Sequence, residues 1–244
     1  MTTQLQYTSE NLLVLQGNNK EDPNQILSST SEKAGRELIS FEVRRLRKGQ
    51  NWTFKTADNE LVTVNLSGQY SMLSNLREWI RFGDCENVFS GARSVLYLPC
   101  QTDFTINAEI TGEFAVAWVP TDEKNAPRLI SSDQVKISVC EGDNVSRQIN
   151  DLLPPGSPVH RLVLVEVYTP SRNWSSYAPH KPGVHLEVDS VEIHFYKIDA
   201  PKRYAYQRIY TDENPPIHRA GHPIDALSHV IDHSAEFPRD ITPW

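Results

Sequence analysis

Cysteine is scarce in this chain, with three residues in 244, and the three are far apart in the sequence. Cys85, Cys100 and Cys140 form no Cys-x-x-Cys pair, which excludes the common zinc-ribbon and dithiol redox motifs. Widely spaced cysteines in odd number are typical of reduced thiols in a cytoplasmic protein. The sequence therefore predicts a cytoplasmic location.

Long hydrophobic runs are missing as well. No stretch approaches the roughly 20 apolar residues that span a bilayer. The first residues, MTTQLQYTSENLLVLQ, have neither the basic start nor the apolar core of a signal peptide. The formal net charge of −7 argues against a surface dedicated to nucleic acid or to an anionic membrane. We therefore expect neither a membrane nor a nucleic acid as a partner.

Several catalytic motifs are also absent. The chain has no Gly-x-Ser-x-Gly, no glycine-rich phosphate loop and no histidine close in sequence to a cysteine. The N-terminal half has no histidine at all, because all eight lie between His160 and His233. Histidine is the commonest metal ligand and the usual acid–base group near neutral pH. A metal or proton-transfer site is therefore expected in the C-terminal half.

Period-two alternation of apolar and polar residues is the dominant pattern that is present. In ELISFEVRRLRKG, Ile39, Phe41 and Val43 face one way and the residues between them face the other. Further candidate strands are 52–54, 61–66, 94–98, 103–108, 113–119, 162–168, 188–196 and 204–210. Short strands separated by Gly, Pro, Asn and Asp predict an all-β chain. Residues 74–82, SNLREWIRF, are the exception and are expected to form one helix or an irregular loop.

The chain divides by composition into four parts. Strand-rich residues 1–125 and 159–213 are separated by a polar inter-domain segment, 126–158, which contains Pro154-Pro155-Gly156. This layout fits two stacked barrels, with one long sandwich as the alternative. Residues 214–244 form a divergent tail rich in proline and histidine, in which the alternation stops.

One segment of the C-terminal half gathers candidate metal ligands. A strand leads through a polar loop to His180, and in the next strand the alternation puts Glu192, His194 and Tyr196 on one face. His180 and Glu192 would then project into one barrel mouth, with His185 as a third ligand. A catalytic divalent site takes three or four protein ligands. The alternative is that His194 stacks in the barrel while His180 and His185 lie in a solvated loop.

The tail carries four histidines of its own. His229 and His233 are four residues apart, which would align them on a helix for joint coordination. No further motif flanks them, so the alternative is that the tail histidines lie on the surface.

Residues 163–180, VLVEVYTPSRNWSSYAPH, resemble EVYTPGGNWSSYPPHKHD, the signature of the 5-deoxy-glucuronate isomerases. SVLYLPCQTDFTINA (94–108), VEIHFYKI (191–198) and YAYQRIYTDE (204–213) are similar to other segments of that family. The resemblance covers roughly residues 36–213. It implies a bicupin of two antiparallel β-barrels, or jelly rolls, that interconverts 5-deoxy-glucuronate and 5-dehydro-2-deoxy-gluconate in myo-inositol catabolism. It also implies a homo-oligomer.

The resemblance implies a divalent metal, Zn, Mn, Fe or Ni, held by a His-x-His pair, a glutamate and a later histidine. His180 matches the first histidine and Glu192 the glutamate, but Pro182 stands where the second histidine belongs and has no ligand atom. His185 is the nearby replacement. His222 is a substitute for the later histidine, since the strands that close the second barrel are missing or replaced in residues 214–244.

Other residues are candidates for binding the sugar acid. Arg147 lies in GDNVSRQI, which resembles an inter-domain segment of the family, and its guanidinium could pair with the substrate carboxylate. Its alternative role is a salt bridge. Tyr177 and Lys181 flank His180 and could bond sugar hydroxyls, or be structural. Glu166 is expected to face the barrel interior as a base or as a structural acceptor.

Two functions remain open from the sequence. The first is the aldose–ketose isomerase. The second is a non-catalytic bicupin that binds a sugar acid or a partner protein, which Pro182 and the divergent tail favour. Retention of His180, Glu192 and the NWSSY loop favours the enzyme.

Overall fold

The computed structural model describes residues 14, 17, 19–31, 39–175, 193–199, 205–209 and 217–221. Strands make up most of these residues, which confirms the all-β class that the alternation predicts. In chain order the elements are β1 (Gln25–Ser29), β2 (Ser40–Leu46), β3 (Asn51–Lys55), β4 (Asn59–Asn65), β5 (Gly68–Ser74), β6 (Glu78–Cys85), β7 (Val95–Leu98), β8 (Asp103–Ile110), β9 (Gly112–Pro120), β10 (Arg128–Ile130), the short 3-10 helix η1 (Ser132–Gln134), β11 (Lys136–Cys140), β12 (Arg147–Leu153), β13 (Leu164–Tyr168), β14 (Ala205–Ile209) and β15 (Ile217–Gly221).

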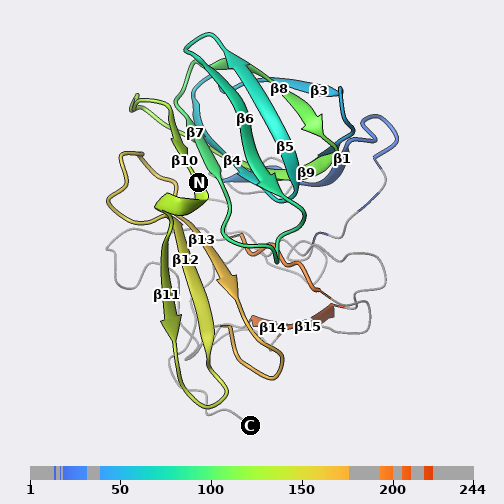
Figure 1. Cartoon of the computed structure of the whole chain (residues 1–244), viewed down its shortest axis with the longest axis vertical. Coiled ribbons are helices and arrows are strands. Elements are labelled where there is room, and N and C mark those ends of the chain that lie inside the picture. Colours follow the sequence, from blue (N-terminus) through green and yellow to red (C-terminus); the bar gives the residue numbers. More distant parts are fainter. Residues whose placement is uncertain are drawn as a thin grey trace, which may run out of the picture.

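The N-terminal part is a sandwich of two antiparallel sheets (Figure 1). One sheet has six strands in the order β1-β2-β9-β4-β7-β10, and the other has four in the order β3-β8-β5-β6. Between them lies an inner core of Leu46, Leu61, Tyr70, Met72, Trp79, Phe82, Leu96, Leu98, Phe104, Ile106, Ala108, Phe114 and Val116. The rings of Tyr70 and Phe114 meet edge-on, with centroids 5.4 Å apart, a geometry that aromatic pairs prefer.

The six-stranded sheet is buried on both faces. Its second face forms a junction core with the chain beyond the sandwich, made of Ile26, Leu27, Val43, Val62, Val64, Leu66, Val95, Tyr97, Ala115, Ala117, Val119, Ile130, Val135, Leu152, Leu153 and Leu162. Because neither face meets water, β7 consists of four consecutive buried residues, Val95 to Leu98, rather than an alternating run.

The prediction of a helix or irregular loop at residues 74–82 is wrong, because these residues form a β-hairpin. Trp79 and Phe82 are both buried in the inner core, and their spacing of three imitates a helix. A β-bulge produces this spacing: Met72 pairs with Trp79 and Tyr70 with Phe82, so β6 has one residue more than β5. Arg81, inside the bulge, has a positive φ of 53°.

The chain beyond the sandwich forms two smaller sheets, β11-β12-β13 and β14-β15, below it in Figure 1. β10 belongs to the sandwich, whereas β11 and β12 pair with β13, so residues 126–158 contribute strands to both parts. β15 lies in the tail, where no strand is predicted from the sequence. The predicted boundaries at residues 125, 158 and 213 remain predictions. No helix within the described part of the chain has the length and apolarity that crossing a bilayer requires.

Candidate functional site

The predicted metal ligands lie outside the described residues. This applies to His180, His185, Glu192 and His222, and equally to Pro182, Tyr177 and Lys181. Within the ranges that the structure describes, no three His, Cys, Asp or Glu side chains come together in a way that could hold a metal ion. The structure does describe the residues that flank 176–192 in the chain, namely those up to residue 175 and those from residue 193.

The segment that follows Glu192 docks on the sandwich. Ile193 and Phe195 pack against the junction core, and the ring of Phe195 lies 5.5 Å from that of Phe41. The rings of His194 and Tyr196 stack on each other, with centroids 6.2 Å apart and planes 15° apart. Ile193 and Phe195 face the sandwich, as the predicted alternation implies. The predicted strand 188–196 is not confirmed in its described part, because residues 194–196 do not belong to a strand.

Lys197 continues this docking with an ion pair. Its Nζ lies 2.7 Å from Oε2 of Glu113 on β9, and Oε1 of the same carboxylate accepts a hydrogen bond from Arg45 Nε at 3.0 Å. Burial raises the pKa of Glu113, but the charges and hydrogen bonds of Lys197 and Arg45 outweigh it and hold the pKa below its ordinary value. Glu113 is therefore an ionised carboxylate that joins two strands of the sandwich to the C-terminal half.

Glu166 on β13 makes a second connection between the two parts. Asn150 donates to its Oε2 at 2.8 Å, and Nε of Arg93 lies 3.3 Å from its Oε1. Burial raises the pKa of Glu166, which hydrogen bonding by Asn150 and the charge of Arg93 only partly offset. Glu166 thus contacts the sandwich, and of the two predicted roles the structure shows the structural acceptor.

Arg93 is 1% exposed and organises the loop between β6 and β7. Its guanidinium donates to the carbonyl oxygens of Asn87, Val88 and Gly91. The hydroxyl of Tyr168 on β13 donates to the same Val88 oxygen at 2.6 Å. Burial raises the pKa of Tyr168 to about 12. Nothing in the sequence distinguishes Arg93 from a surface arginine, because its acceptors are backbone oxygens of a loop.

Glu60 on β4 makes a third connection. It is fully buried, and its carboxylate accepts hydrogen bonds from three consecutive backbone N–H groups, those of His160, Arg161 and Leu162, at 2.9, 2.6 and 3.0 Å. Tyr97 donates its hydroxyl to the same carboxylate at 3.0 Å. These bonds compensate the cost of burying the charge and fix the chain just before β13. Sequence reasoning missed Glu60, because its partners are backbone groups about 100 residues away.

Two segments that contain predicted site residues meet at the N-terminal end of β12. The backbone N–H of Trp174 donates to the Asn144 carbonyl at 2.7 Å, and that of Ser146 donates to Asn173 Oδ1 at 3.0 Å. The loop that leads toward His180 is thereby attached to the turn that precedes Arg147. Arg147 is half-buried and donates to the Val145 carbonyl at 3.1 Å.

The described strands form antiparallel sheets, with a sandwich first and a three-stranded sheet packed on its outer face. This arrangement defines an all-β protein of the cupin type, as the resemblance implies. The chain belongs to the KduI/IolB family, whose model matches residues 12–222. It is 30% identical to the 5-deoxy-glucuronate isomerase of Geobacillus kaustophilus and 31% identical to that of Geobacillus thermodenitrificans, over 82% of this chain and 74% of each relative. An IolB-like protein from Salmonella typhimurium has the same fold, with a TM-score of 0.78 and 24% identity over 92% of this chain and 88% of the other.

Proposed function

We propose that this protein is an aldose–ketose isomerase that converts 5-deoxy-glucuronate to 5-dehydro-2-deoxy-gluconate in myo-inositol catabolism. The observation that carries the proposal is the match to relatives named as 5-deoxy-glucuronate isomerases, which spans 82% of the chain. The fold agrees over almost the whole length with that of an IolB-like protein.

The proposed metal site consists of His180 and Glu192, completed by His185 in place of the histidine that Pro182 replaces and by His222 in place of the later histidine. Imidazole and carboxylate donors suit Zn, Mn, Fe or Ni. The chemistry that such a site supplies when loaded is polarisation of the substrate's C1 and C2 oxygens, which acidifies the proton on C2. Transfer of that proton from C2 to C1, together with transfer of the C2 hydroxyl proton to the C1 oxygen, would convert the aldose into the ketose.

Arg147 is the proposed partner of the substrate carboxylate. Within the part of the chain that the structure describes, Arg147 makes no ion pair, and its guanidinium donates a hydrogen bond to the Val145 carbonyl. Arg147 follows Ser146, whose N–H bonds Asn173 at the start of the NWSSY segment, and its guanidinium can bind the acid end of the sugar through two parallel hydrogen bonds. Tyr177 and Lys181 are proposed to bind sugar hydroxyls.

The three cysteines, all within the described part of the chain, are free thiols, which supports a cytoplasmic location. The proposed partner is a small-molecule sugar acid. Homo-oligomerisation remains a prediction.

Isomerisation tests the proposal directly. We expect the purified wild-type protein, incubated with 5-deoxy-glucuronate and followed by NMR, to form the ketose. The Arg147→Lys variant keeps the charge but loses the bidentate geometry, and we expect its kcat/KM to fall by about tenfold to a hundredfold. The matched control is Arg128→Lys, an exposed arginine on β10, which should leave kcat/KM unchanged. Absence of ketose in the wild type would leave the non-catalytic bicupin as the function.

A further inference from the structure

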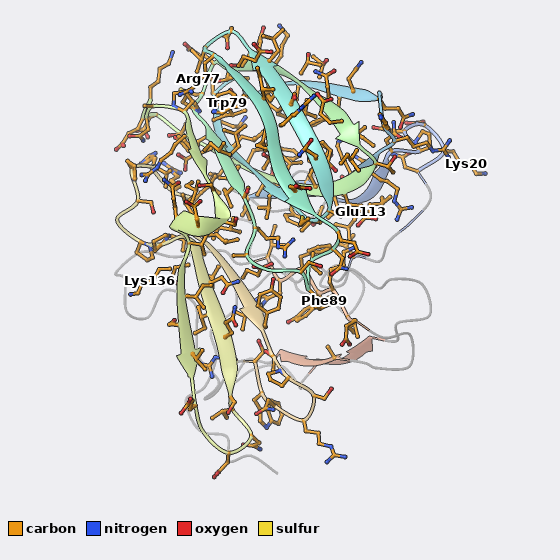
Figure 2. The ribbon with its side chains drawn as sticks, viewed as in Figure 1. Lys20, Arg77, Trp79, Phe89, Glu113 and Lys136 are labelled. Carbon is orange, nitrogen blue, oxygen red and sulfur yellow. The ribbon has the colours of Figure 1, made fainter. Side chains whose placement is uncertain are left out.

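The four-stranded sheet β3-β8-β5-β6 has one face in the inner core and one face directed away from it. In Figure 2 this sheet, where Trp79 is labelled, lies in the upper part of the molecule. An antiparallel sheet with one solvated face normally presents polar residues on that face. Leu73 on β5 and Ile80 on β6 each follow a buried residue in their strands and therefore point outward. They are 59% and 69% exposed, and Ile110 at the end of β8 is 50% exposed, so the outer face has an apolar component.

Polar side chains on the same outer face are bonded to one another across neighbouring strands. These bonds join the hydroxyls of Thr53 and Thr105 at 2.9 Å, Ser71 Oγ and Glu109 Oε1 at 2.7 Å, and Lys55 Nζ and Asp103 Oδ2 at 2.7 Å. Covering a polar group is costly mainly when it loses its partner. Because these groups are paired within the sheet, another surface can cover them without leaving them unsatisfied. The hydroxyl side chains are also short and lose little conformational entropy when they are covered.

The two edges of this sheet are less suited to a partner than its outer face. β6 forms one edge and contains a β-bulge, in which Arg81 has a φ of 53°. β3 forms the other edge and ends at the exposed Lys55. Bulges and charged side chains on edge strands oppose the addition of a further strand. A partner is therefore expected to pack face to face on the sheet, as two sheets do in a sandwich.

We propose that the outer face of the four-stranded sheet is an interface between two copies of this chain. A twofold interface places the same patch on both sides, so the patch has to be complementary to itself. This face meets that condition, because neither sign of charge dominates it: its charged residues are Lys55, Arg81, Glu78, Asp103 and Glu109. Standard strand spacings give the face an area of roughly 500 Å², less than the roughly 800 Å² that each partner buries in a stable complex. We therefore expect a dimer that dissociates at micromolar concentrations. The inference goes beyond the proposed function and does not depend on it.

The test measures the mass of the full-length protein by sedimentation velocity between about 1 and about 100 µM. Leu73→Lys places a cation opposite Glu78, its cross-strand partner, so the isolated chain keeps its stability while the interface would have to bury a charge. Ile137→Lys is the matched control, because Ile137 is 52% exposed on β11, in a different sheet. Urea unfolding of each variant verifies that the fold is retained.

We expect the wild type to convert from monomer to dimer over this range, Leu73→Lys to weaken the dimer by about tenfold or more, and Ile137→Lys to behave as the wild type does. A wild type that stays monomeric at the highest concentration would overturn the proposal and leave a different protein as the occupant of the face. A dimer that Leu73→Lys leaves intact would overturn it as well, as would equal dissociation of both variants. If the wild type forms a larger assembly through further surfaces, Leu73→Lys should halve its mass, and an unchanged mass would contradict the proposed interface.

Discussion

The two parts of the molecule differ in their histidine content and in the size of their sheets. The N-terminal sandwich has two sheets, an aromatic inner core and no histidine. The C-terminal half carries all eight histidines, and its described strands form sheets of three and two strands, of which the three-stranded sheet packs on the sandwich. The sandwich therefore supplies most of the buried apolar surface, and the ligand-type side chains lie in the half that depends on it.

Polar side chains also join the two parts. Three carboxylates join them: Glu60 binds backbone N–H groups, Glu113 binds two cations, and Glu166 binds Asn150 and Arg93. Each carboxylate has at least one bond that crosses between the sandwich and the chain that follows it, namely those from Glu60 to residues 160–162, from Glu113 to Lys197 and from Glu166 to Arg93. The C-terminal half is thus placed by specific polar contacts in addition to the apolar junction core.

The largest expected effect is at Glu60. In Glu60→Gln, one carboxylate oxygen becomes an NH₂ group that faces buried donors, and we expect a loss of about 3 kcal/mol in the free energy of unfolding. Urea unfolding measures this loss. Glu78→Gln, at an exposed position on β6, is the control and should change stability by less than about 0.5 kcal/mol. A loss at Glu60 no larger than that at Glu78 would contradict the proposed role of the connection.

A pair of valine truncations compares the two halves directly. Val116 is fully buried in the inner core, and Val167 on β13 is 40% exposed. We expect Val116→Ala to reduce the free energy of unfolding by about 2 kcal/mol, and Val167→Ala by less than about 1 kcal/mol. Equal losses in thermal or urea unfolding would show that the C-terminal sheet is packed as tightly as the sandwich.

The pH dependence of stability should have opposite signs at Glu113 and Glu166. The folded pKa of Glu113 is lowered, so its ionised form contributes stability above the unfolded value of about 4.3, which is lost as pH falls through the folded pKa. The folded pKa of Glu166 is raised, so its contribution is fully present below the unfolded value and is lost as pH rises through the folded pKa.

Glu113→Gln should therefore be less stable than the wild type by about 1 kcal/mol at pH 7, with the difference shrinking in acid. In Glu166→Gln, the free energy of unfolding of the wild type relative to the variant should instead fall as pH rises. Urea unfolding at several pH values measures both differences. The same trend in both variants would contradict the assignment of the two environments.

The smallest expected effect is at Arg172, in the loop that leads toward the predicted ligands. Arg172 has a φ of 69°, a conformation that glycine adopts without strain and other residues adopt at a cost. We expect Arg172→Gly to stabilise the fold by roughly 0.5 kcal/mol, once the greater freedom of glycine in the unfolded chain is included. A small rise in Tm is the expected result, and a fall would show that the arginine side chain makes a contribution of its own.

The sequence predicts about half of the strands that the structure describes, and it predicts the long-range polar contacts poorly. It does not predict β1, β5, β6, β10, β11, β12 or β15. Alternation at Ile39, Phe41 and Val43 identifies β2 because one strand face contacts the junction core. It fails at Trp79 and Phe82, where a bulge shifts the register and gives a helical spacing to two strand residues. A bulge depends on the partner strand, which local sequence does not specify.

The candidate site shows the same limit. The resemblance identifies the family from the EVYTPSRNWSSYAPH segment, and the family match confirms it. Arg93, Glu60 and Lys197 could not be predicted, because each acquires its role from a partner far away in the sequence: a loop carbonyl, a backbone turn or a carboxylate on β9. The ligands His180, His185, Glu192 and His222 remain predictions from the resemblance and from residue type.

The metal content of the purified protein tests the proposed function most directly, because that function includes a divalent metal bound in the half that carries all eight histidines. Elemental analysis would compare the wild type with His180→Ala and Glu192→Ala after incubation with Zn²⁺ or Mn²⁺. The account predicts about one divalent ion per chain in the wild type and its loss in both variants. A wild-type protein without bound metal, or variants that retain it fully, would contradict the account.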